Sequence, residues 1–494
     1  MLQPFPVDDA RRFRDYFREQ DYTVGRLRDQ LRFRDLPLGR ANILLRMLDV
    51  TREPSAINTL VRLFFIGVDQ PAASVTAVLP DWLIDLSSSH GLLERTADGV
   101  IRPLVQINPI DQHLVLSDPA LGIAQEHADL VLWPNPTTSL LASATIRRPS
   151  RATLDLGAGG GVLSLLAQGF SERVVATDIN PRCREFAEFN FQLNGLAIEY
   201  RLGDSFAPVA GEKFDLIVSN PPFFITPISQ YVYCDNPLEL DSFCRRLARE
   251  APAHLEEGGF YQMLCEWAEI EGQPWRERLL EWFEGSGCDI WVIRGNVTSA
   301  AEYASDRFFE LSPQCSMERT GEYNRWMDYY RSQNLKAVHA GLVTMRKRNA
   351  TQNWIQIDES LRSRAELWNV LDQCFAVRDE LALTGREELF SWRVRVSPEA
   401  RLSRWSAITP EGWSAGEVKL ELLSGLKTIL PVQELVAEFL GRFGEGRMLG
   451  EVIAELASEV DAPREQVENE CEAIARRMLD QLFLERVPAT VVAA

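Results

Sequence analysis

The pattern of apolar and polar residues changes twice along the chain, which divides it into three regions. Over residues 1 to about 85, apolar residues recur at helical spacing, as in "LGRANILLRML" and "INTLVRLFFIGV". A short helix, a Ser/Gly turn and two strands that meet at Asp98-Gly99 come next. Helices followed by a hairpin are typical of winged-helix-like units. We therefore expect a mostly helical, winged-helix-like domain over residues 1–120.

From about residue 150, strands alternate with helices. Seven apolar segments read as strands, and they begin at residues 152, 173, 199, 214, 259, 288 and 336. Helical stretches such as "GVLSLLAQGF" and "PRCREFAEFNFQLNG" separate them. This alternation predicts an α/β domain with a mostly parallel sheet covered on both faces, which we assign to residues 121–349. The late pair of strands indicates that one strand joins antiparallel at the edge.

A third region follows the basic triplet Arg346–Arg348 and a polar break near Asn349–Asn353. Asp461 and Pro463 mark a helix start near its end. Apolar residues at helical spacing come next: Val467, Cys471, Ile474, Met478 and Leu482. We expect a mixed, mainly helical domain over residues 350–494, in which this stripe packs in the core and binds no cofactor.

Composition narrows the class of protein. A chain of 494 residues is too long for one core. Its eight cysteines and five histidines show no C-x-x-C pair and no zinc spacing, so we expect neither a metal site nor a disulfide scaffold. The start of the chain lacks a signal-peptide pattern, and the most apolar run is too short to span a bilayer. We expect a cytoplasmic protein with no membrane partner.

The charge balance bears on possible partners. The formal net charge of -19 disfavours strong non-specific nucleic-acid binding, which depends on a basic field. Arginines recur through the first forty residues but are interleaved with acids, so we interpret them as a solvated helical face.

A glycine-rich turn ends the first strand of the α/β region, in "LDLGAGGGVLSLL". Gly157, Gly159 and Gly161 alternate there, and glycine lets backbone amides approach a ligand closely. The dinucleotide fingerprint G-x-G-x-x-G needs a small residue where this chain has Val162. Asp155 precedes the first glycine, and an acid suits a cationic ligand better than a pyrophosphate. The turn therefore disfavours a nicotinamide-dependent oxidoreductase.

Polar groups also end the next three strands. Asp178 can accept both hydroxyls of a ribose, and Asp204 can accept from an adenine amino group with Phe206 packing nearby. The fourth strand ends in Asn220-Pro-Pro-Phe. A single aspartate at a strand end is often only a turn former. Four such groups in phase predict a ligand site at the carboxyl edge of the sheet.

Together these motifs resemble the class I S-adenosylmethionine-dependent methyltransferases of the small-domain type, over residues 127–348. The resemblance implies a Rossmann-like seven-stranded methyltransferase sheet, flanked by the N-terminal winged-helix-like domain and a C-terminal helical domain. It implies S-adenosylmethionine as cofactor and no metal. The methionine end would lie at Asp155 and the three glycines, the ribose at Asp178 and the adenine at Asp204 and Phe206. Thr137 to Leu140 would lie in a helix that covers the cofactor.

The motif N-P-P-[FY] marks family members that methylate adenine N6, guanine N2 or glutamine N5. Asn220, whose side chain also lies by the cofactor, and the Pro221 carbonyl can each accept one N–H of such a planar nitrogen. This draws the nitrogen toward a tetrahedral geometry. Pro221 and Pro222 stiffen the acceptor pair. Phe223 can stack on the flat target, which is worth about 1–3 kcal/mol. Asn220, Pro221, Pro222 and Phe223 are thus the predicted catalytic residues.

The choice of acceptor rests on finer signals. Phenylalanine at the fourth motif position resembles the RNA enzymes, whereas release-factor glutamine methyltransferases usually carry tyrosine. Phe224 stands where the ribosomal guanine enzymes often carry histidine, and the acidic net charge favours a protein substrate. We expect a nucleobase in RNA as the main substrate. The alternatives are a release-factor-type glutamine N5-methyltransferase, an enzyme that methylates a small-molecule amine, and a non-catalytic scaffold. Tyr231, Tyr233 and Asp241 are further candidates for the substrate cleft.

Overall fold

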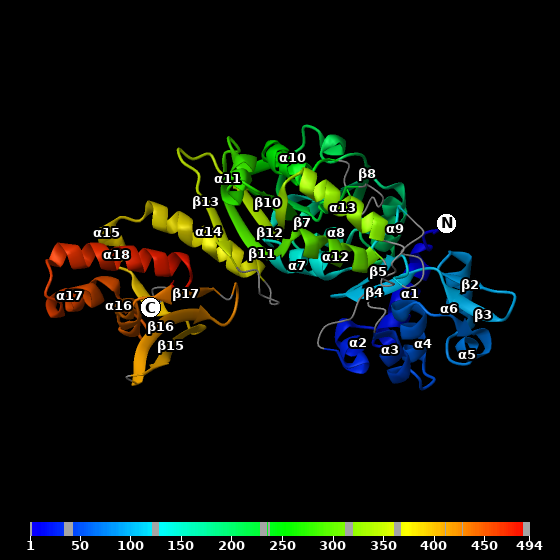
Figure 1. Cartoon of the computed structure of the whole chain (residues 1–494). Coiled ribbons are helices and arrows are strands. Elements are labelled where there is room, and N and C mark those ends of the chain that lie inside the picture. The colour runs from blue at the N-terminus through cyan, green and yellow to red at the C-terminus, as the bar shows by residue number, and fades with distance from the viewer. Residues whose placement is uncertain are drawn as a thin grey trace. The chain divides into compact units, whose positions relative to one another are not determined.

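The computed structural model describes residues 2–33, 43–120, 128–227, 235, 238–311, 320–359, 367–410, 412–426 and 428–487. The chain divides into two compact units (Figure 1). The first consists of Met1–Ala142 and Arg147–Glu359, and the second of Ser143–Ile146 and Ser360–Ala494. Residues 1–120, expected as a domain of their own, thus belong to the same compact unit as the α/β region.

The N-terminal part combines short helices with a small antiparallel sheet. Its helices are α1 Val7–Glu19, α2 Val24–Leu31, α3 Leu44–Val50, α4 Ala56–Leu60, the π-helix η2 Val61–Ile66, α5 Ala72–Thr76 and α6 Asp81–Ser89. The sheet has the order β1-β3-β2, with β1 Gln70–Pro71, β2 Leu93–Arg95 and β3 Val100–Pro103. The order along the chain is helices, a strand, two helices and a hairpin, and the winged-helix-like class of this part stays a prediction.

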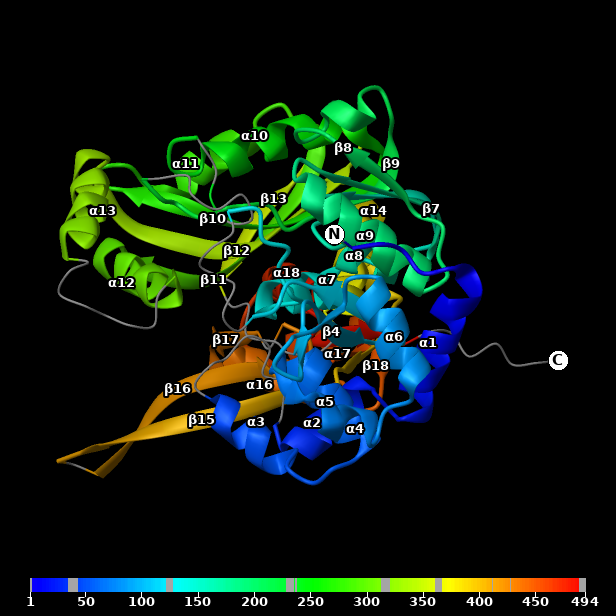
Figure 2. The same cartoon turned by 90° about the vertical axis from the view of Figure 1, so that its right-hand side faces the viewer.

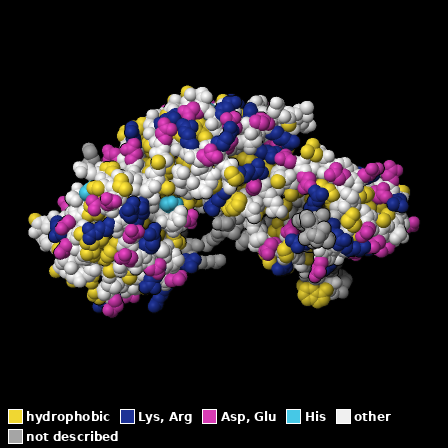
Figure 3. All heavy atoms as spheres, turned by 180° about the vertical axis from the view of Figure 1, so that it is seen from behind, with side chains coloured by type: hydrophobic (Ala, Val, Ile, Leu, Met, Phe, Trp, Pro, Cys, Tyr) yellow, Lys and Arg dark blue, Asp and Glu magenta, His cyan; other side chains and the backbone are white. Residues whose placement is uncertain are grey.

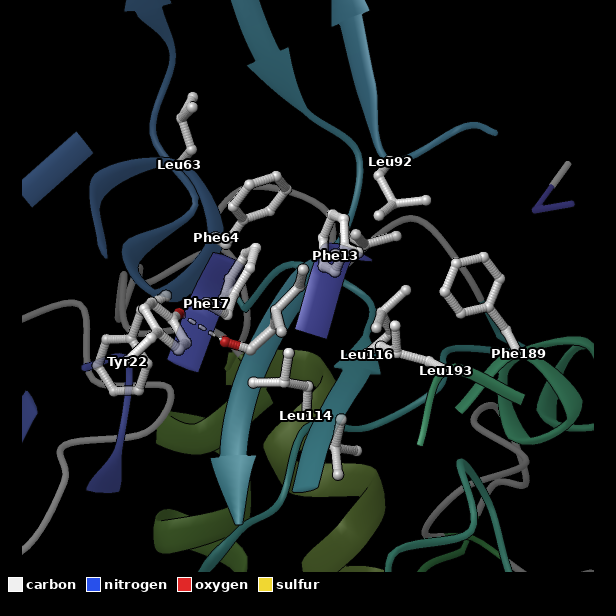
Figure 4. Close-up of a cluster of buried hydrophobic side chains, with 14 of the residues drawn as sticks. Phe13, Phe17, Tyr22, Leu63, Phe64, Leu92, Leu114, Leu116, Phe189 and Leu193 are labelled. Atoms are coloured by element: carbon white, nitrogen blue, oxygen red, sulfur yellow. Dashed lines mark hydrogen bonds between the residues drawn. The ribbon is translucent and has the colours of Figure 1, made fainter. Parts of the chain in front are cut away.

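One hydrophobic core joins these helices to the α/β region. Phe5, Phe13 and Phe17 pack in the same cluster as Phe189 and Leu193 of α9 (Pro181–Leu193), as Figure 4 shows in part. The rings of Phe5 and Phe189 lie 5.0 Å apart. A ribbon of β4 (Gln106–Ile110) and β5 (His113–Ser117) connects the two parts. The N-terminal helices therefore cover apolar surface of the α/β region.

The central sheet has eight strands in the order β13-β11-β12-β10-β9-β6-β7-β8. They are β6 Ser150–Leu156, β7 Ser171–Asp178, β8 Glu199–Leu202, β9 Phe214–Ser219, β10 Leu255–Ile270, β11 Cys288–Ser299, β12 Leu335–Lys347 and β13 Ile355–Glu359. The seven predicted strands are confirmed, and β13 is an addition that the apolar pattern did not indicate. It pairs parallel with β11 at the sheet edge.

The expected place of the antiparallel strand was wrong. β12 runs antiparallel to both β10 and β11 and lies between them, inside the sheet. Most of β12 is buried, which suits an interior strand better than an edge strand with one solvated side. The remaining neighbouring strands pair in parallel: β6 with β7, β6 with β9, β7 with β8 and β9 with β10.

Helices cover both faces of the sheet (Figures 1 and 2). Ala176 of β7 packs in the cluster shared with α9, whereas its neighbour Val175 packs with the opposite helices, because successive strand residues face opposite sides. The other helices of this part are α7 Pro136–Ala144, α8 Val162–Ala167, α10 Ser242–Glu250, α11 Trp275–Leu280, α12 Ala300–Leu311 and α13 Thr320–Ser332. Among the described helices, none has both the length and the apolar composition needed to cross a bilayer.

The second unit has a mixed α/β core. Its helices are α14 Trp368–Leu383, α15 Arg386–Phe390, α16 Glu434–Gly441, α17 Leu449–Glu459 and α18 Arg464–Asp480. The predicted stripe on α18 packs into the core through Val467, Cys471 and Met478. Two three-stranded sheets accompany the helices. One contains β14 Arg393–Val396, β18 Arg447–Met448 and β19 Leu484–Arg486, and the other β15 Ala400–Thr409, β16 Gly412–Leu422 and β17 Ile429–Val432.

Candidate active site

A cavity lies at the carboxyl ends of β6, β7 and β9. Eight of the residues predicted from the sequence line it: Asp155, Gly157, Gly159, Asp178, Asp204, Asn220, Pro221 and Pro222. Parallel strands bring their carboxyl ends to one edge of the sheet, which explains why strand-end motifs far apart in the sequence meet here. Gly161, Phe206 and Phe223 are absent from this lining.

Asp155 places a carboxylate in the cavity wall. Its Oδ2 accepts hydrogen bonds from the backbone N–H and the hydroxyl of Ser164, at 2.8 and 2.6 Å. Its Oδ1 is buried and has no hydrogen-bond partner among the residues that the structure describes. Burial raises the pKa of Asp155 to about 7, against the lowering effect of the two Ser164 hydrogen bonds. The side chain can therefore receive a cationic or hydrogen-bonding group at Oδ1.

The glycines of the turn have two different roles. Gly157 and Gly159 adopt positive φ, and a Cβ at either would meet no atom within 4 Å, so their open side faces the cavity. At Gly161, also at positive φ, a Cβ would lie 2.5 Å from the ring of Phe191. Gly161 therefore allows α8 and α9 to pack closely, and its expected contact with the cofactor stays a prediction.

Asp178 is held at the end of β7 by backbone donors. Gly159 N–H donates to its Oδ2 and Asn180 N–H to its Oδ1, both at 2.9 Å. Burial raises the pKa of Asp178, while these backbone hydrogen bonds oppose the rise. Each oxygen keeps a lone pair free of these two contacts, which suits a carboxylate that accepts two ribose hydroxyls.

Asp204 lies on the exposed rim of the cavity. Arg246 of α10 donates to its Oδ1 at 3.2 Å and to Ser205 Oγ at 2.8 Å. The side chain of Asp204 is 58% exposed, so water screens this ion pair. Arg246 was not singled out in the sequence, since nothing in the spacing connects it to Asp204.

Phe206, which was expected to pack near the adenine, does not line the cavity. Phe206 is buried and stacks on His254 with ring centroids 4.6 Å apart, in the core beneath the cavity. The apolar side of the cavity instead comes from Ile179, Phe243 and Leu247. Ile179 is 58% exposed. In the sequence, a bulky apolar residue directly after the strand-end Asp178 could have indicated this position of Ile179.

Asn220 directly follows β9, and its side-chain oxygen has no donor among the described residues. Its Nδ2 donates to the Thr137 hydroxyl at 3.4 Å, and that hydroxyl donates to Asn135 Oδ1 at 2.6 Å. Its Oδ1 is buried, and in the described part of the chain no donor reaches it. Asn135 and Thr138, near the start of α7, line the same cavity. Of the residues Thr137 to Leu140, which were expected to cover the cofactor, Thr138 lines the cavity and Thr137 contacts Asn220.

We call the segment of residues 220–223 the elbow. Its other three residues lie partly in the cavity wall and partly in the core. Pro221 and Pro222 line the cavity. Phe223 is partly buried, packs against the apolar cluster below and meets Phe224 at 5.4 Å between ring centroids. Phe223 therefore does not line the cavity, where its stacking on the target was expected. The aromatic side chains in the lining are Trp133 and Phe243, which the sequence analysis did not single out.

The other cleft candidates have different outcomes. Asp241 is buried, accepts from Ala268 N–H at 2.8 Å and forms an ion pair with Arg278, so it fixes the start of α10 to β10. Tyr231 and Tyr233 lie outside the described residues. Across the described ranges, no group of three His, Cys, Asp or Glu side chains is arranged to hold a metal ion.

The cavity fits the cofactor that the motifs imply. S-adenosylmethionine carries an ammonium group, a ribose and an adenine. Asp155 Oδ1 offers an unpartnered acceptor beside an open glycine turn, and Asp178 offers two further acceptor positions. Ile179, Phe243 and Leu247 offer apolar surface for a flat ring. These residues would hold the cofactor, and Asn220 Oδ1 would remain for the methyl acceptor.

Comparison with protein families agrees with this geometry. Residues 134–268 match the family described as methyltransferase small domain. Residues 37–103 match a family described as a domain of unknown function, DUF7059.

Individual proteins are similar to part of the chain. A release factor glutamine methyltransferase from Cereibacter sphaeroides is 35% identical over 158 residues, which are 29% of this chain and 55% of that protein. Another from Geobacter sulfurreducens is 27% identical over 246 residues, 46% of this chain and 81% of that protein. A methyltransferase structure from Pyrococcus furiosus shares 19% identity, covers 44% of this chain and 85% of its own, and has a TM-score of 0.26. The chain spans about half the length of the first of these relatives.

Proposed function

The central α/β region is a class I S-adenosylmethionine-dependent methyltransferase domain of the small-domain type, and from this premise we propose that the protein methylates the amide nitrogen of a glutamine side chain in a protein substrate. The observation that carries the proposal is Asn220, whose Oδ1 is buried at the cavity without a hydrogen-bond partner among the described residues. A buried acceptor of this kind costs free energy until a donor reaches it, so its retention at the site fits a substrate N–H.

The chemistry follows from a poor nucleophile. An amide nitrogen shares its lone pair with the carbonyl and does not readily attack carbon. When bound, S-adenosylmethionine supplies an electrophilic methyl group on a positively charged sulfur. Asn220 Oδ1 and the Pro221 carbonyl can each accept one N–H, which turns the nitrogen lone pair out of conjugation. The fixed φ of Pro221 and Pro222 keeps this acceptor pair oriented before the substrate arrives.

Loss of the amide proton needs no dedicated base. After transfer the nitrogen is cationic and strongly acidic, so water can take its proton. Asp178 is held by backbone N–H groups and Asp204 lies on the rim, so neither carboxylate is aimed at this step. The unpartnered Oδ1 of Asp155 is assigned to the ammonium group of the cofactor. The residues of the site therefore orient and polarise the substrate and do not act as a general base.

Two observations favour a protein glutamine over a nucleobase. The relatives reported above are release factor glutamine methyltransferases. The chain has a net charge of -19, and on the face drawn in Figure 3 basic and acidic side chains are interspersed. Phenylalanine at the fourth motif position remains the feature that resembles the RNA enzymes, so a nucleobase acceptor is the alternative that the experiment must separate.

The test uses radiolabelled S-adenosylmethionine and release factors purified from cells that lack this protein. We expect wild-type protein to label a release factor and Asn220→Ala to lose about 100-fold or more of the rate, while its S-adenosylhomocysteine affinity changes little. A parallel reaction uses whole extract from the same cells. Label that appears only in this extract and disappears with ribonuclease would show that the acceptor is a nucleobase and not a glutamine. Label that is equal for the two proteins would overturn the role of Asn220.

A further inference from the structure

Two tyrosine hydroxyls hold the backbone just after the elbow. Ile225 is fully buried, its N–H donates to Tyr303 Oη at 3.1 Å, and its carbonyl accepts from the Tyr330 hydroxyl at 2.8 Å. Tyr303 lies on α12 and Tyr330 on α13. Both polar groups of one backbone residue are therefore bound by side chains from two helices that lie between β11 and β12 in the chain.

Tyr303 is in turn held by a buried carboxylate. Its hydroxyl donates to Glu266 Oε2, and Arg307 donates to Glu266 Oε1 at 3.0 Å. Glu266 is 4% exposed, and a buried carboxylate is costly unless its oxygens are hydrogen-bonded and its charge is balanced. Tyr303 and Arg307 meet both conditions. Because the Tyr303 proton points at Glu266, the phenol oxygen is left to accept from Ile225.

The same network touches the aromatic end of the elbow. The guanidinium carbon of Arg307 lies 3.3 Å from the centre of the Phe224 ring, close enough for a cation–π contact. Phe224 contacts Phe223 in turn. Glu266, through Arg307, therefore also fixes the residue that follows the N-P-P-F motif.

The residue before the elbow, Ser219, is held by a second anchor, which also involves β10. Ser219 pairs with Met263 of β10, and its hydroxyl donates to the Leu156 carbonyl at 2.8 Å. Glu266 lies three residues beyond Met263 on β10. Pro221 and Pro222 between these anchors have no N–H to donate. The direction of the Asn220 and Pro221 oxygens thus depends on where the two ends are held.

We propose that Glu266, acting through Tyr303 and Arg307, is a positioning residue that holds the far end of the elbow so that the Asn220 and Pro221 oxygens face the acceptor nitrogen. The inference rests on the proposed function. It adds positioning residues that lie outside the N-P-P-F motif. Glu266 does not line the cavity and its oxygens face Tyr303 and Arg307, so it acts through these partners and not on the substrate.

Hydrogen exchange tests the anchor without any acceptor. In Tyr303→Phe the Ile225 N–H loses its acceptor while ring packing is kept. We expect exchange in the peptide covering residues 217–225 to rise about tenfold or more, with S-adenosylhomocysteine affinity within about twofold of wild type. The control is Tyr329→Phe, whose hydroxyl meets Leu240 N–H at 3.3 Å outside this network. Unchanged exchange in Tyr303→Phe would overturn the anchor.

Turnover tests the consequence on the acceptor identified above. We expect Tyr303→Phe to lower kcat about tenfold or more, with KM for both substrates within about threefold, because orientation and not binding is lost. Glu266→Gln keeps an acceptor for Tyr303 and should retain more kcat than Glu266→Ala. Melting curves confirm that each variant is folded. Wild-type kcat in Tyr303→Phe would overturn the positioning role, whereas no labelling by wild type would overturn the proposed acceptor and leave the exchange result valid.

Discussion

Asp155 carries a charge into the cavity wall with too few partners to stabilise it. Ser164 satisfies one oxygen, while the other has no partner within the described residues. Burial therefore raises the pKa of Asp155 to about 7, and the free protein holds this carboxyl partly protonated near neutral pH. An ammonium group at Oδ1 would favour the ionised form, so cofactor binding and proton release are linked at this residue.

Asp155→Asn should remove a pH dependence of stability. Because the folded-state pKa lies above the unfolded value of about 4, the folded protein binds this proton more tightly, and the free energy of unfolding falls as pH rises from about 4 to about 7. We expect the melting temperature of wild type to fall relative to that of Asp155→Asn between about pH 5 and about pH 8. Saturating S-adenosylhomocysteine should reduce the difference. Parallel melting curves at all pH values would show that Asp155 stays ionised.

Asp178 and Asp204 should differ in their effect on the cofactor. Asp178 is held by two backbone N–H groups inside the cavity, whereas Asp204 is exposed and paired with Arg246. We expect Asp178→Asn to weaken S-adenosylhomocysteine binding about 30-fold or more and Asp204→Asn by only a few-fold, since water competes at the rim. Titration calorimetry of both variants checks this. Equal losses would place the adenine closer to Asp204 than its exposure indicates.

At the scale of elements, α9 connects the glycine turn to the N-terminal ribbon. The Asn190 side chain is fully buried, accepts from Leu116 N–H at 2.7 Å and donates to the carbonyls of Leu116 and Gly160. One turn later, Asn194 makes the equivalent pair of bonds to Leu114 of β5 but none to the turn. The helix therefore carries two matched bridges, of which one reaches the cofactor turn.

Asn190→Ala and Asn194→Ala should separate stability from binding. Each substitution leaves backbone groups of β5 without their side-chain partner, so each should lower the free energy of unfolding by about 1–3 kcal/mol. Asn190→Ala should also weaken S-adenosylhomocysteine binding several-fold, because the Gly160 carbonyl loses its donor. Urea unfolding and ligand titration measure the two effects. Equally weak binding in Asn194→Ala would mean that lower stability of the N-terminal part, and not the loss of the Gly160 hydrogen bond, weakens the site.

The strand-end groups could be predicted because each follows an apolar strand directly, and parallel strands must bring their carboxyl ends to one edge. Asp155, Asp178 and Asn220 meet in the cavity for this reason. The buried position of Phe206 could not be predicted, because its ring stacks on His254, a residue that is distant in the sequence. Arg246 and Trp133 were missed for the same reason, since tertiary packing alone brings them to the rim and wall.

At the scale of the whole molecule, the two compact units differ in their relation to the cavity. The lining residues lie between Leu130 and Leu247 and all belong to the first unit. That unit also contains the N-terminal helices, whose core extends into α9 through Phe5, Phe13 and Phe17. The expected boundary near residue 120 therefore crosses a continuous core, whereas the one near 350 falls close to the limit between the units.

Removal of residues 1–120 is expected to unfold the α/β region, and removal of residues 360–494 is expected to leave it intact. Without the N-terminal helices, Phe189, Phe191 and Leu193 would lose the cluster that buries them, at about 1.5–3 kcal/mol for each fully exposed side chain, and the apolar patch would promote aggregation. A chain of residues 1–359 keeps this core and every cavity residue, so it should melt cooperatively and bind S-adenosylhomocysteine within about twofold of the full chain. Soluble, cofactor-binding protein from residues 121–494 would show instead that the N-terminal part folds against the domain without supporting it.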